Sequence, residues 1–402
     1  MDTMSSTGDR PPGLRVRQRT PVSARVRAPQ LPPGLEQYLR TAEAALAEPF
    51  KGVTTDGQGV PGLFPIRRTG VSVRPLVEVA LAFIASLSVE QNTRALFPID
   101  SDAWRRWSNI HPFLMRHGVS LEELGSEPRA RALSLLRESL SLDGFRTARD
   151  VMRLNEFIGQ VTGSHAEYGE WLYWLSMMGT PSPVEPWGWQ LDGHHLIVNC
   201  FVLGDQMVMT PMFMGSEPVA ADTGPYAGTR AFRAEEEGGL ALMRALTPAQ
   251  QATAILSPTL PGEAFTAAFR DNFEMKYEGL SLQALSSAQQ RLALAVLETY
   301  VGRLRPGHAE IRMEEVRHHL AATHFAWMGG FDEQSVFYYR LHSPVILVEF
   351  DHQRGIALDN DQPSRTHIHT VVRTPNGNDY GRDLLRQHHQ QFDHMNPGHA
   401  HR

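Results

Sequence analysis

Residues 194–214 read HHLIVNCFVLGDQMVMTPMFM, and this stretch decides how the chain folds. Two short apolar runs, rich in β-branched side chains and methionine, flank the pair Gly204-Asp205. Apolar runs on either side of a two-residue Gly-Asp turn are typical of a β-hairpin. Because hairpins join antiparallel strands, we predict an antiparallel sheet with two histidines at the start of one strand.

Helical periodicity surrounds this hairpin in the sequence. From residue 34 to about residue 163, segments such as LVEVALAFIASLS (76–88) repeat apolar residues at three- and four-residue spacing. Further helices are expected across 234–256 and 282–325, and strand-like runs return between 335 and 374. We therefore predict an α+β fold, with a helix-rich N-terminal half and a mostly antiparallel β-sheet that bears a histidine-rich site.

The domain organisation follows from length and composition. A chain of 402 residues can bury the core of one large domain. Residues 1–33 are rich in Arg, Pro, Ser and Thr, and their few large apolar groups do not repay the entropy lost on ordering. We predict a disordered tail over 1–33, a single domain over 34–389, and a polar, histidine-containing tail over 390–402.

Composition excludes several classes of protein. A net charge of −6 gives no general reason to expect nucleic-acid or membrane binding. Cys200 is the single cysteine, so no intrachain disulfide can form and a reducing compartment is expected. The longest apolar stretch (75–89) contains Glu78 and is too short to span a bilayer, and the first residues lack the apolar core of a signal peptide. We expect a cytoplasmic protein.

A metal site is indicated by RTHIHTVVRT (365–374), in which His367 and His369 lie two residues apart in a strand-like run. Residues i and i+2 of a strand share a face and lie roughly 6–7 Å apart. Two imidazoles that lean together from this spacing can bind one ion at about 2.0–2.1 Å. The alternative is a pair of histidines on a solvated face of the sheet.

The adjacent pair His194 and His195 adds further candidate ligands. Neighbouring strand residues face opposite ways, so one of them joins His367 and His369 easily and the other contacts a carboxylate or the substrate. A break in the strand at Gly193 would relax this restriction. The alternative is a strand start with one exposed and one hydrogen-bonded histidine.

A carboxylate ligand is expected in PVILVEFDHQ (344–353), where Glu349 and Asp351 follow four apolar residues on one face of a strand. A buried, ionised carboxylate is costly unless it is paired or binds a metal. Either residue suits a ligand, a partner that orients a ligand, or a general base. We favour Glu349, because the apolar run directly before it implies deeper burial; in the alternative the strand ends there and both groups are solvated.

Substrate-binding candidates lie in the turn RTPNGNDYG (373–381). Arg373 has the strand parity of His367 and His369, and a guanidinium beside a metal suits an anionic substrate. The polar turn side chains bind substrate or only stabilise the loop, and a tryptophan in PWGWQ forms an apolar wall or packs in the core. The predicted substrate-binding residues are Arg373, Asn376, Asn378, Asp379 and Trp189.

Several long segments together resemble the DUF3500 family, a group of domains of unknown function found in bacteria and fungi. They are PWGWQLDGHHL, TPMFMGSEPV, FAWMGG, YYRLHSPVILVEFDHQ and HIHTVVRTPNGNDYGRDLLRQHH, in this order. The resemblance extends over about residues 50–389. It implies a single domain whose signature segments contain the candidate site, and it implies no particular reaction and no particular metal.

The residues favour a metal-dependent enzyme with a mononuclear site. Its cofactor would be one divalent transition metal, Cu, Fe or Zn, since imidazole binds all three. Its substrate would be a small, anionic organic molecule, and an oxidoreductase is slightly favoured. The alternatives are a hydrolase or lyase, either metal-dependent or using histidine and Glu349 as acid and base, and a non-catalytic metal-binding protein. The candidate metal ligands are His194, His195, His367, His369 and Glu349, and the catalytic candidates are Glu349 and Arg373.

Overall fold

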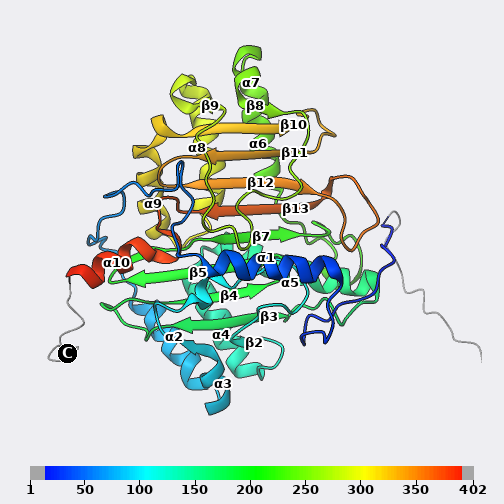
Figure 1. Ribbon diagram of the computed structural model, residues 1–402, viewed down its shortest axis with the longest axis vertical. Coiled ribbons are helices and arrows are strands. Elements are labelled where there is room, and N and C mark those ends of the chain that lie inside the picture. The colour runs from blue at the N-terminus through cyan, green and yellow to red at the C-terminus, as the bar shows by residue number, and fades with distance from the viewer. Residues whose placement is uncertain (1–13, 392–402) are drawn as a thin grey trace, which may run out of the picture.

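A computed structural model describes residues 14–391. Figure 1 shows one large sheet that runs through the whole molecule, with helices on both of its faces. The strands are β1 Leu96–Phe97, β2 Val119–Ser120, β3 Tyr173–Met178, β4 Trp187–Gly193, β5 Leu196–Leu203, β6 Gln206–Val208, β7 Met212–Ser216, β8 Ile255–Ser257, β9 Leu280–Ser281, β10 His324–Gly329, β11 Phe337–His342, β12 Leu347–Gln353 and β13 Ser364–Arg373. The α-helices are α1 Pro33–Ala47, α2 Arg74–Ser86, α3 Val89–Ala95, α4 Ser126–Ser139, α5 Leu142–Thr162, α6 Arg233–Ala245, α7 Pro248–Ala254, α8 Ser287–Val301, α9 His308–His318 and α10 Arg382–Gln391.

The sheet has 13 strands in the order β1-β3-β4-β5-β7-β13-β12-β11-β10-β8, and β2, β6 and β9 pair with β3, β5 and β10. Among the described strands, the parallel pairs are β1 with β3 and β8 with β10, and the other pairs are antiparallel. The mostly antiparallel sheet is therefore confirmed. Strands β7 and β13 lie at its centre, so segments far apart in the sequence meet there.

The hairpin at Gly204-Asp205 is confirmed, because Leu203 pairs with Gln206 where β5 turns into β6. The methionine-rich run then divides at Pro211, which has no N–H to donate to a ladder. Strand β7 begins beyond it and pairs with both β5 and β13. Strand β7 therefore lies between β5, which follows His195, and β13, which contains His367.

The two faces of the sheet carry different layers. Ile368 and Val372 of β13 point into the larger apolar core, which the sheet forms with α2, α4, α5, α6 and α8. Val371 points to the opposite face, where α1, α10 and coil segments form a second core. Figure 1 shows α1 crossing this second face. Because side chains alternate along a strand, His367 and His369 share the face of Val371.

The prediction of a helix-rich N-terminal half is not confirmed. Helices α6–α10 follow in the second half of the chain, and β1–β5 already begin within the first half. The helical periodicity of residues 34–163 arises from α1, α2, α4 and α5, which cover a sheet rather than form a separate bundle. No described helix has the length and apolar character needed to cross a membrane.

Residues 14–32, part of the predicted disordered tail, pack on the surface of the domain as coil that contains one β-bridge. Val16 forms a bridge with Leu358, and Ala24 is 2% exposed. Three arginines of this segment pair with carboxylates of the domain: Arg17 with Asp361, Arg19 with Glu167 and Arg25 with Glu122. These contacts offset part of the ordering entropy that made disorder the expectation. The rest of the predicted tails, residues 1–13 and 392–402, lies outside the described residues.

Candidate metal centre

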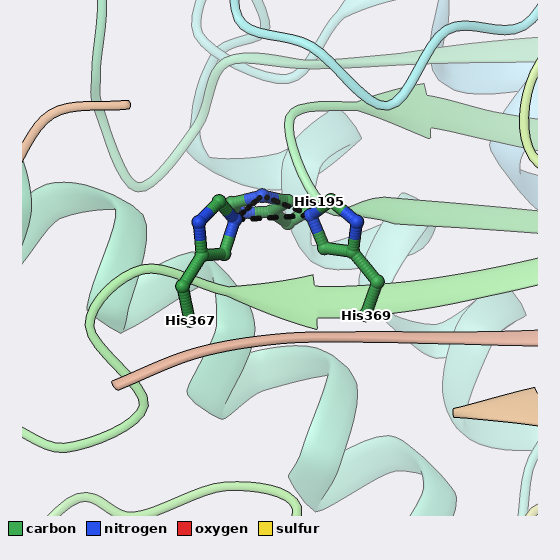
Figure 2. A group of neighbouring side chains, drawn as sticks. All are labelled: His195, His367 and His369. Atoms are coloured by element: carbon green, nitrogen blue, oxygen red, sulfur yellow. Dashed lines mark hydrogen bonds between the residues drawn. The ribbon is translucent and has the colours of Figure 1, made fainter. Parts of the chain in front are cut away.

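Three histidines meet at the centre of the sheet, and we call them the histidine triad. Figure 2 shows His367 and His369 rising from β13 toward His195. Their Nε2 atoms lie 3.0 Å apart between His367 and His369, 3.1 Å between His369 and His195, and 3.2 Å between His367 and His195. The three side chains are 2–6% exposed. Within residues 14–391 this is the one cluster of three His, Cys, Asp or Glu ligand atoms close enough to hold an ion.

A glycine in β7 lets the triad form. Gly215 pairs with His369 across the β7–β13 ladder, and its N–H donates to the His195 carbonyl at 2.8 Å. A Cβ at this position would lie 2.8 Å from His369 Cδ2 and 3.3 Å from His195 Cδ2. Glycine inside a strand often marks a close approach, and here it allows the two imidazoles to converge over the sheet.

His195 has an unfavourable backbone conformation. It lies in the turn between β4 and β5 with φ of +60°, in the left-handed region. This region costs most L-residues about 1–2 kcal/mol, and glycine or asparagine occupies it more readily. The N–H of His195 donates to the carbonyl of Asn109 at 3.1 Å, which helps to hold the turn. A strained histidine in place of glycine is typical of a side chain that a site requires.

Two acceptors lie behind the triad. His367 Nδ1 donates to the Arg354 carbonyl at 2.7 Å, which leaves the Nε2 lone pair of His367 available. His369 Nδ1 lies 3.9 Å from Asp351 Oδ1, and neither atom has a hydrogen-bond partner among the described residues. Asp351 and His369 are direct partners in the β12–β13 ladder. This is the placement of a carboxylate that orients a metal-binding imidazole.

The donor set fits a metal ion. Each Nε2 has a single in-plane position for a proton or a lone pair, yet each lies near two other Nε2 atoms, so pairwise hydrogen bonds do not satisfy all three. Burial first, and the neighbouring histidines second, lower the pKa of His195 and of His369 well below the ordinary value. Neutral imidazoles at these separations can all reach one ion at about 2.0–2.1 Å.

Replacing Asp351 by asparagine is expected to weaken zinc binding about 10- to 100-fold, because outer partners of this kind contribute that much to metal affinity. Competition with a chromogenic chelator measures the effect. Glu349→Gln is the matched control, since both changes replace a fully buried carboxyl group of β12 by an amide and only Asp351 faces a triad histidine. Equal affinities in the two variants would contradict the role assigned to Asp351.

Glu349 lies outside the triad. Its carboxylate accepts hydrogen bonds from the N–H groups of Phe265 (2.7 Å) and Thr266 (2.9 Å), from the Thr266 hydroxyl, and from the Tyr338 hydroxyl (2.8 Å). Four donors thus occupy its two oxygens. The burial expected for Glu349 is present, but Asp351 is equally buried, and Asp351 is the carboxylate beside a histidine.

His194 is not a member of the triad. Its Nδ1 lies 2.7 Å from Asn155 Oδ1, and the Asn155 amide donates to the Gly169 carbonyl at 2.9 Å. His194 Nδ1 is therefore the donor to Asn155. The ring of His194 stacks on that of His195 with centroids 3.9 Å apart and an interplanar angle of 26°. Of the adjacent pair, His195 joins the triad and His194 supports its ring.

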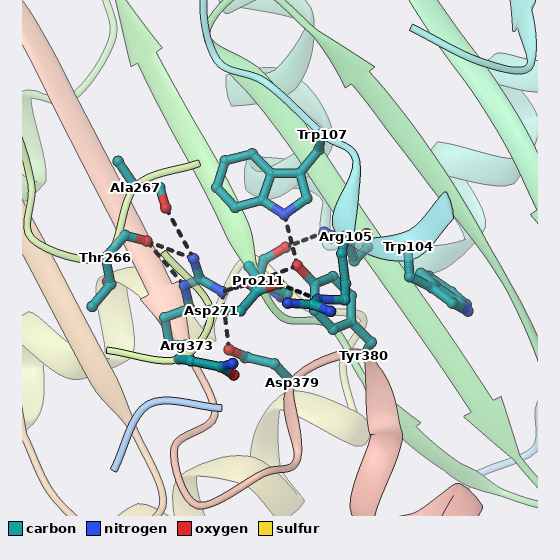
Figure 3. Close-up of polar contacts among 12 residues, drawn as sticks. Trp104, Arg105, Trp107, Pro211, Thr266, Ala267, Asp271, Arg373, Asp379 and Tyr380 are labelled. Carbon is teal, nitrogen blue, oxygen red and sulfur yellow. Dashed lines mark hydrogen bonds and ion pairs between the residues drawn. The ribbon is translucent and has the colours of Figure 1, made fainter. Parts of the chain in front are cut away.

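Arg373 shares the face of the triad but has no donor left for a substrate. Figure 3 shows its guanidinium between two carboxylates and two backbone carbonyls. Nε and NH2 donate to the Thr266 carbonyl, NH2 also donates to that of Ala267, and NH1 contacts Asp271 at 2.8 Å and Asp379 at 3.2 Å. These five contacts engage the five N–H groups of a guanidinium. In this structure Arg373 ties the sheet to the coil that covers it.

The other predicted substrate residues do not reach the triad. The side chains of Asn376 and Asn378 bond backbone groups of neighbouring segments, and Asp379 accepts the Thr374 N–H at 2.7 Å. They stabilise the turn. Trp189 lies in the larger apolar core, on the face of the sheet opposite the histidines.

Sequence reasoning missed three groups that shape the site: Gly215, Asn155 and Glu217. Glu217 Oε2 lies 3.8 Å from His367 Nδ1. A glycine within an apolar strand was a usable signal for Gly215. Asn155 lies within the long helix α5, and no local pattern marks it as a partner of His194.

The family profile described as "Protein of unknown function (DUF3500)" matches residues 69–382, a span that contains the whole triad. No curated protein and no solved structure matches the chain.

Proposed function

For this chain, which belongs to the DUF3500 family, we propose the function of a metal-dependent enzyme. The observation that supports it is the convergence of three buried Nε2 atoms within 3.0–3.2 Å of one another. Burying three imidazoles with their Nε2 atoms directed at one another is costly unless they share a ligand. The family description states no reaction, so the proposal depends on the side chains of the chain itself.

The triad would hold one divalent transition metal from the group that imidazole binds well, Cu, Fe or Zn. Asp351 and the Arg354 carbonyl would orient His369 and His367. Three protein ligands leave coordination positions for water or a reactant, whereas structural zinc sites usually have four protein ligands, often thiolates. Such an ion supplies Lewis acidity and, with Cu or Fe, electron transfer.

Within this class we favour an oxidoreductase that acts on a small organic molecule. A set of neutral imidazoles without thiolate suits redox-active ions as well as zinc. A hydrolase with the same ligands is the alternative, and the natural metal would separate the two. The expectation of an anionic substrate came from Arg373. Because Arg373 has no free donor, the proposal no longer includes a negative charge on the substrate.

The proposal is tested by measuring whether an ion bound at the triad has an open coordination position. The full chain is loaded with Cu²⁺ and titrated with azide while the visible absorption is recorded. We expect about one equivalent of triad-bound Cu²⁺ and a saturable new absorption band, because three protein ligands leave a position for an added anion. The His367→Ala variant retains every histidine of the C-terminal tail. Its copper content therefore measures the copper bound by that tail, and this amount is subtracted from the copper content of the parent.

Two outcomes would overturn the proposal. If the chain holds no more copper than His367→Ala holds, there is no metal centre. If copper binds at the triad and azide leaves its spectrum unchanged, the site is coordinatively closed and the protein is a metal carrier rather than an enzyme.

A further inference from the structure

The segment 14–26 crosses the domain beside the triad, and we call it the N-terminal strap. In Figure 1 it lies at the right-hand end of the sheet, where β13 begins. At its start, Arg17 N–H donates to the Ala357 carbonyl at 2.9 Å. Near its end, Ala24 N–H donates to the Ala166 carbonyl at 2.9 Å. The strap is therefore docked at two places, one at Ala357 and the other at Ala166.

The first docking place is the loop behind His367. The carbonyl of Arg354, at the start of this loop, accepts from His367 Nδ1. The Glu217 carboxylate holds the same loop through the N–H groups of residues 356–358, at 2.9–3.1 Å. Val16 of the strap forms a β-bridge with Leu358. The strap thus pairs with the loop that orients one ligand of the triad.

The second docking place is connected to His195 through side-chain contacts. Arg19 NH2 donates to Glu167 Oε2 at 3.0 Å and to the Tyr168 hydroxyl at 2.7 Å. Tyr168 packs against the ring of His194, with centroids 5.4 Å apart, and His194 stacks on His195. Contacts therefore run without a break from Arg19 to another ligand of the triad.

Arg19 is the strongest single attachment of the strap. Its partner Glu167 is 2% exposed and also accepts the Val22 N–H at 2.7 Å. Burial disfavours the charged carboxylate, but hydrogen bonds from His111 and Arg19 outweigh this effect and lower the pKa of Glu167 to about 2. By contrast, Arg25 pairs with Glu122 where both side chains are 37–40% exposed, and solvent screens that pair.

We propose that the strap is a clamp over the metal centre, with the Arg19–Glu167 ion pair as its latch. This inference depends on the proposed metal site. The triad is only 2–6% exposed, so an ion or a reactant enters only when something covering it moves. The strap has no helix and only one isolated bridge, and segments of this kind open at low free energy. When docked it holds the supports of both His367 and His195.

A clamp requires reciprocal coupling. If strap docking strengthens metal binding, metal binding must strengthen strap docking by the same factor. Trypsin reports strap docking, because it cleaves after Arg15, Arg17 and Arg19. We expect zinc to slow cleavage at these positions at least about tenfold, a factor within the usual range of coupling between sites. Mass spectrometry of the released peptides measures it.

The decisive experiment is zinc release to excess chelator by stopped flow. Arg19→Ala in the full chain is expected to release zinc at least about tenfold faster, again within the usual range of coupling. Arg25→Ala, the matched control, is expected to stay within about twofold, because exposed pairs contribute little. Arg17→Pro removes the hydrogen bond to Ala357 at the other docking place, together with the exposed Arg17–Asp361 pair, and is expected to act like Arg19→Ala.

Equal release from Arg19→Ala, Arg17→Pro and the parent would overturn the clamp, as would trypsin cleavage that zinc leaves unchanged. Thermal unfolding of the metal-free variants shows whether they fold. If Arg19→Ala does not fold, Arg17→Pro still tests the clamp. The failure of the two proposals is distinguishable. A chain that binds no zinc at the triad refutes the metal site, whereas tight binding with unaltered release refutes only the clamp.

Discussion

Replacing His195 by asparagine is expected to abolish metal binding at the triad while leaving the fold at least as stable. The variant removes one of three ligands, so we expect affinity to fall by at least about 100-fold, the upper end of what losing an orienting partner alone costs. Asparagine adopts the left-handed conformation of this position (φ +60°) more easily than histidine, so the metal-free variant should gain up to about 1 kcal/mol. Metal content and thermal unfolding measure the two effects.

The control for His195→Asn is His194→Asn. The neighbouring histidine is equally buried in the same turn but lies outside the triad, so this variant should keep its metal with a smaller loss of affinity. A His195→Asn protein that still binds one ion at the triad would contradict the assignment. A lower unfolding temperature of the metal-free variant would show instead that the histidine stabilises the turn.

The pairing of His367 with His369 could be predicted because it depends only on the period of a strand. The choice of His195 over His194 could not. That choice is set by the turn between β4 and β5, where the positive φ of His195 and its hydrogen bond to Asn109 place its side chain. Asn109 lies far away in the sequence, and a local pattern does not contain such a contact.

The carboxylate shows a second limit of local reasoning. Glu349 and Asp351 share a strand face and are both fully buried, so burial does not separate them. The register of β12 against β13 does, because it places Asp351 opposite His369 and Glu349 opposite Val371. Sequence patterning establishes which face a side chain occupies, whereas register is set by pairing across the sheet. The same holds for Arg19, whose partner is 148 residues away.

Arg373 lies on the face of the sheet that was predicted for it, but its contacts are structural. Its position along β13 correctly predicted that Arg373 shares the sheet face of His367 and His369. It could not predict the carboxylates that surround the guanidinium, because these come from other parts of the fold. Asp271 also binds Arg105 at 3.0 Å, and Arg105 donates to the last carbonyls of α1. The guanidinium of Arg373 lies over the ring of Trp107 at 5.4 Å. The network therefore joins β13, α1 and the coil over the sheet.

Replacing Arg373 by methionine is expected to destabilise the protein by about 3–5 kcal/mol, the usual cost of removing one partner of a buried ion pair. Burial opposes the charge of Arg373, but Asp379 and Asp271 outweigh it and raise the pKa of the guanidinium. Without it, Asp379 is left buried with no cation beside it. Urea denaturation measures the loss, and Arg386→Ala, which removes an exposed pair with Asp383, should change stability by less than about 1 kcal/mol.

The same variant separates a structural role for Arg373 from a role in substrate binding. If the lost stability comes from a stranded carboxylate, adding Asp379→Asn should recover part of it, because the second change removes the uncompensated charge. Zinc affinity of the folded Arg373→Met protein should match that of the parent, since the guanidinium contacts no triad histidine. An Arg373→Met protein of unchanged stability would contradict the network and return Arg373 to the list of substrate-binding candidates.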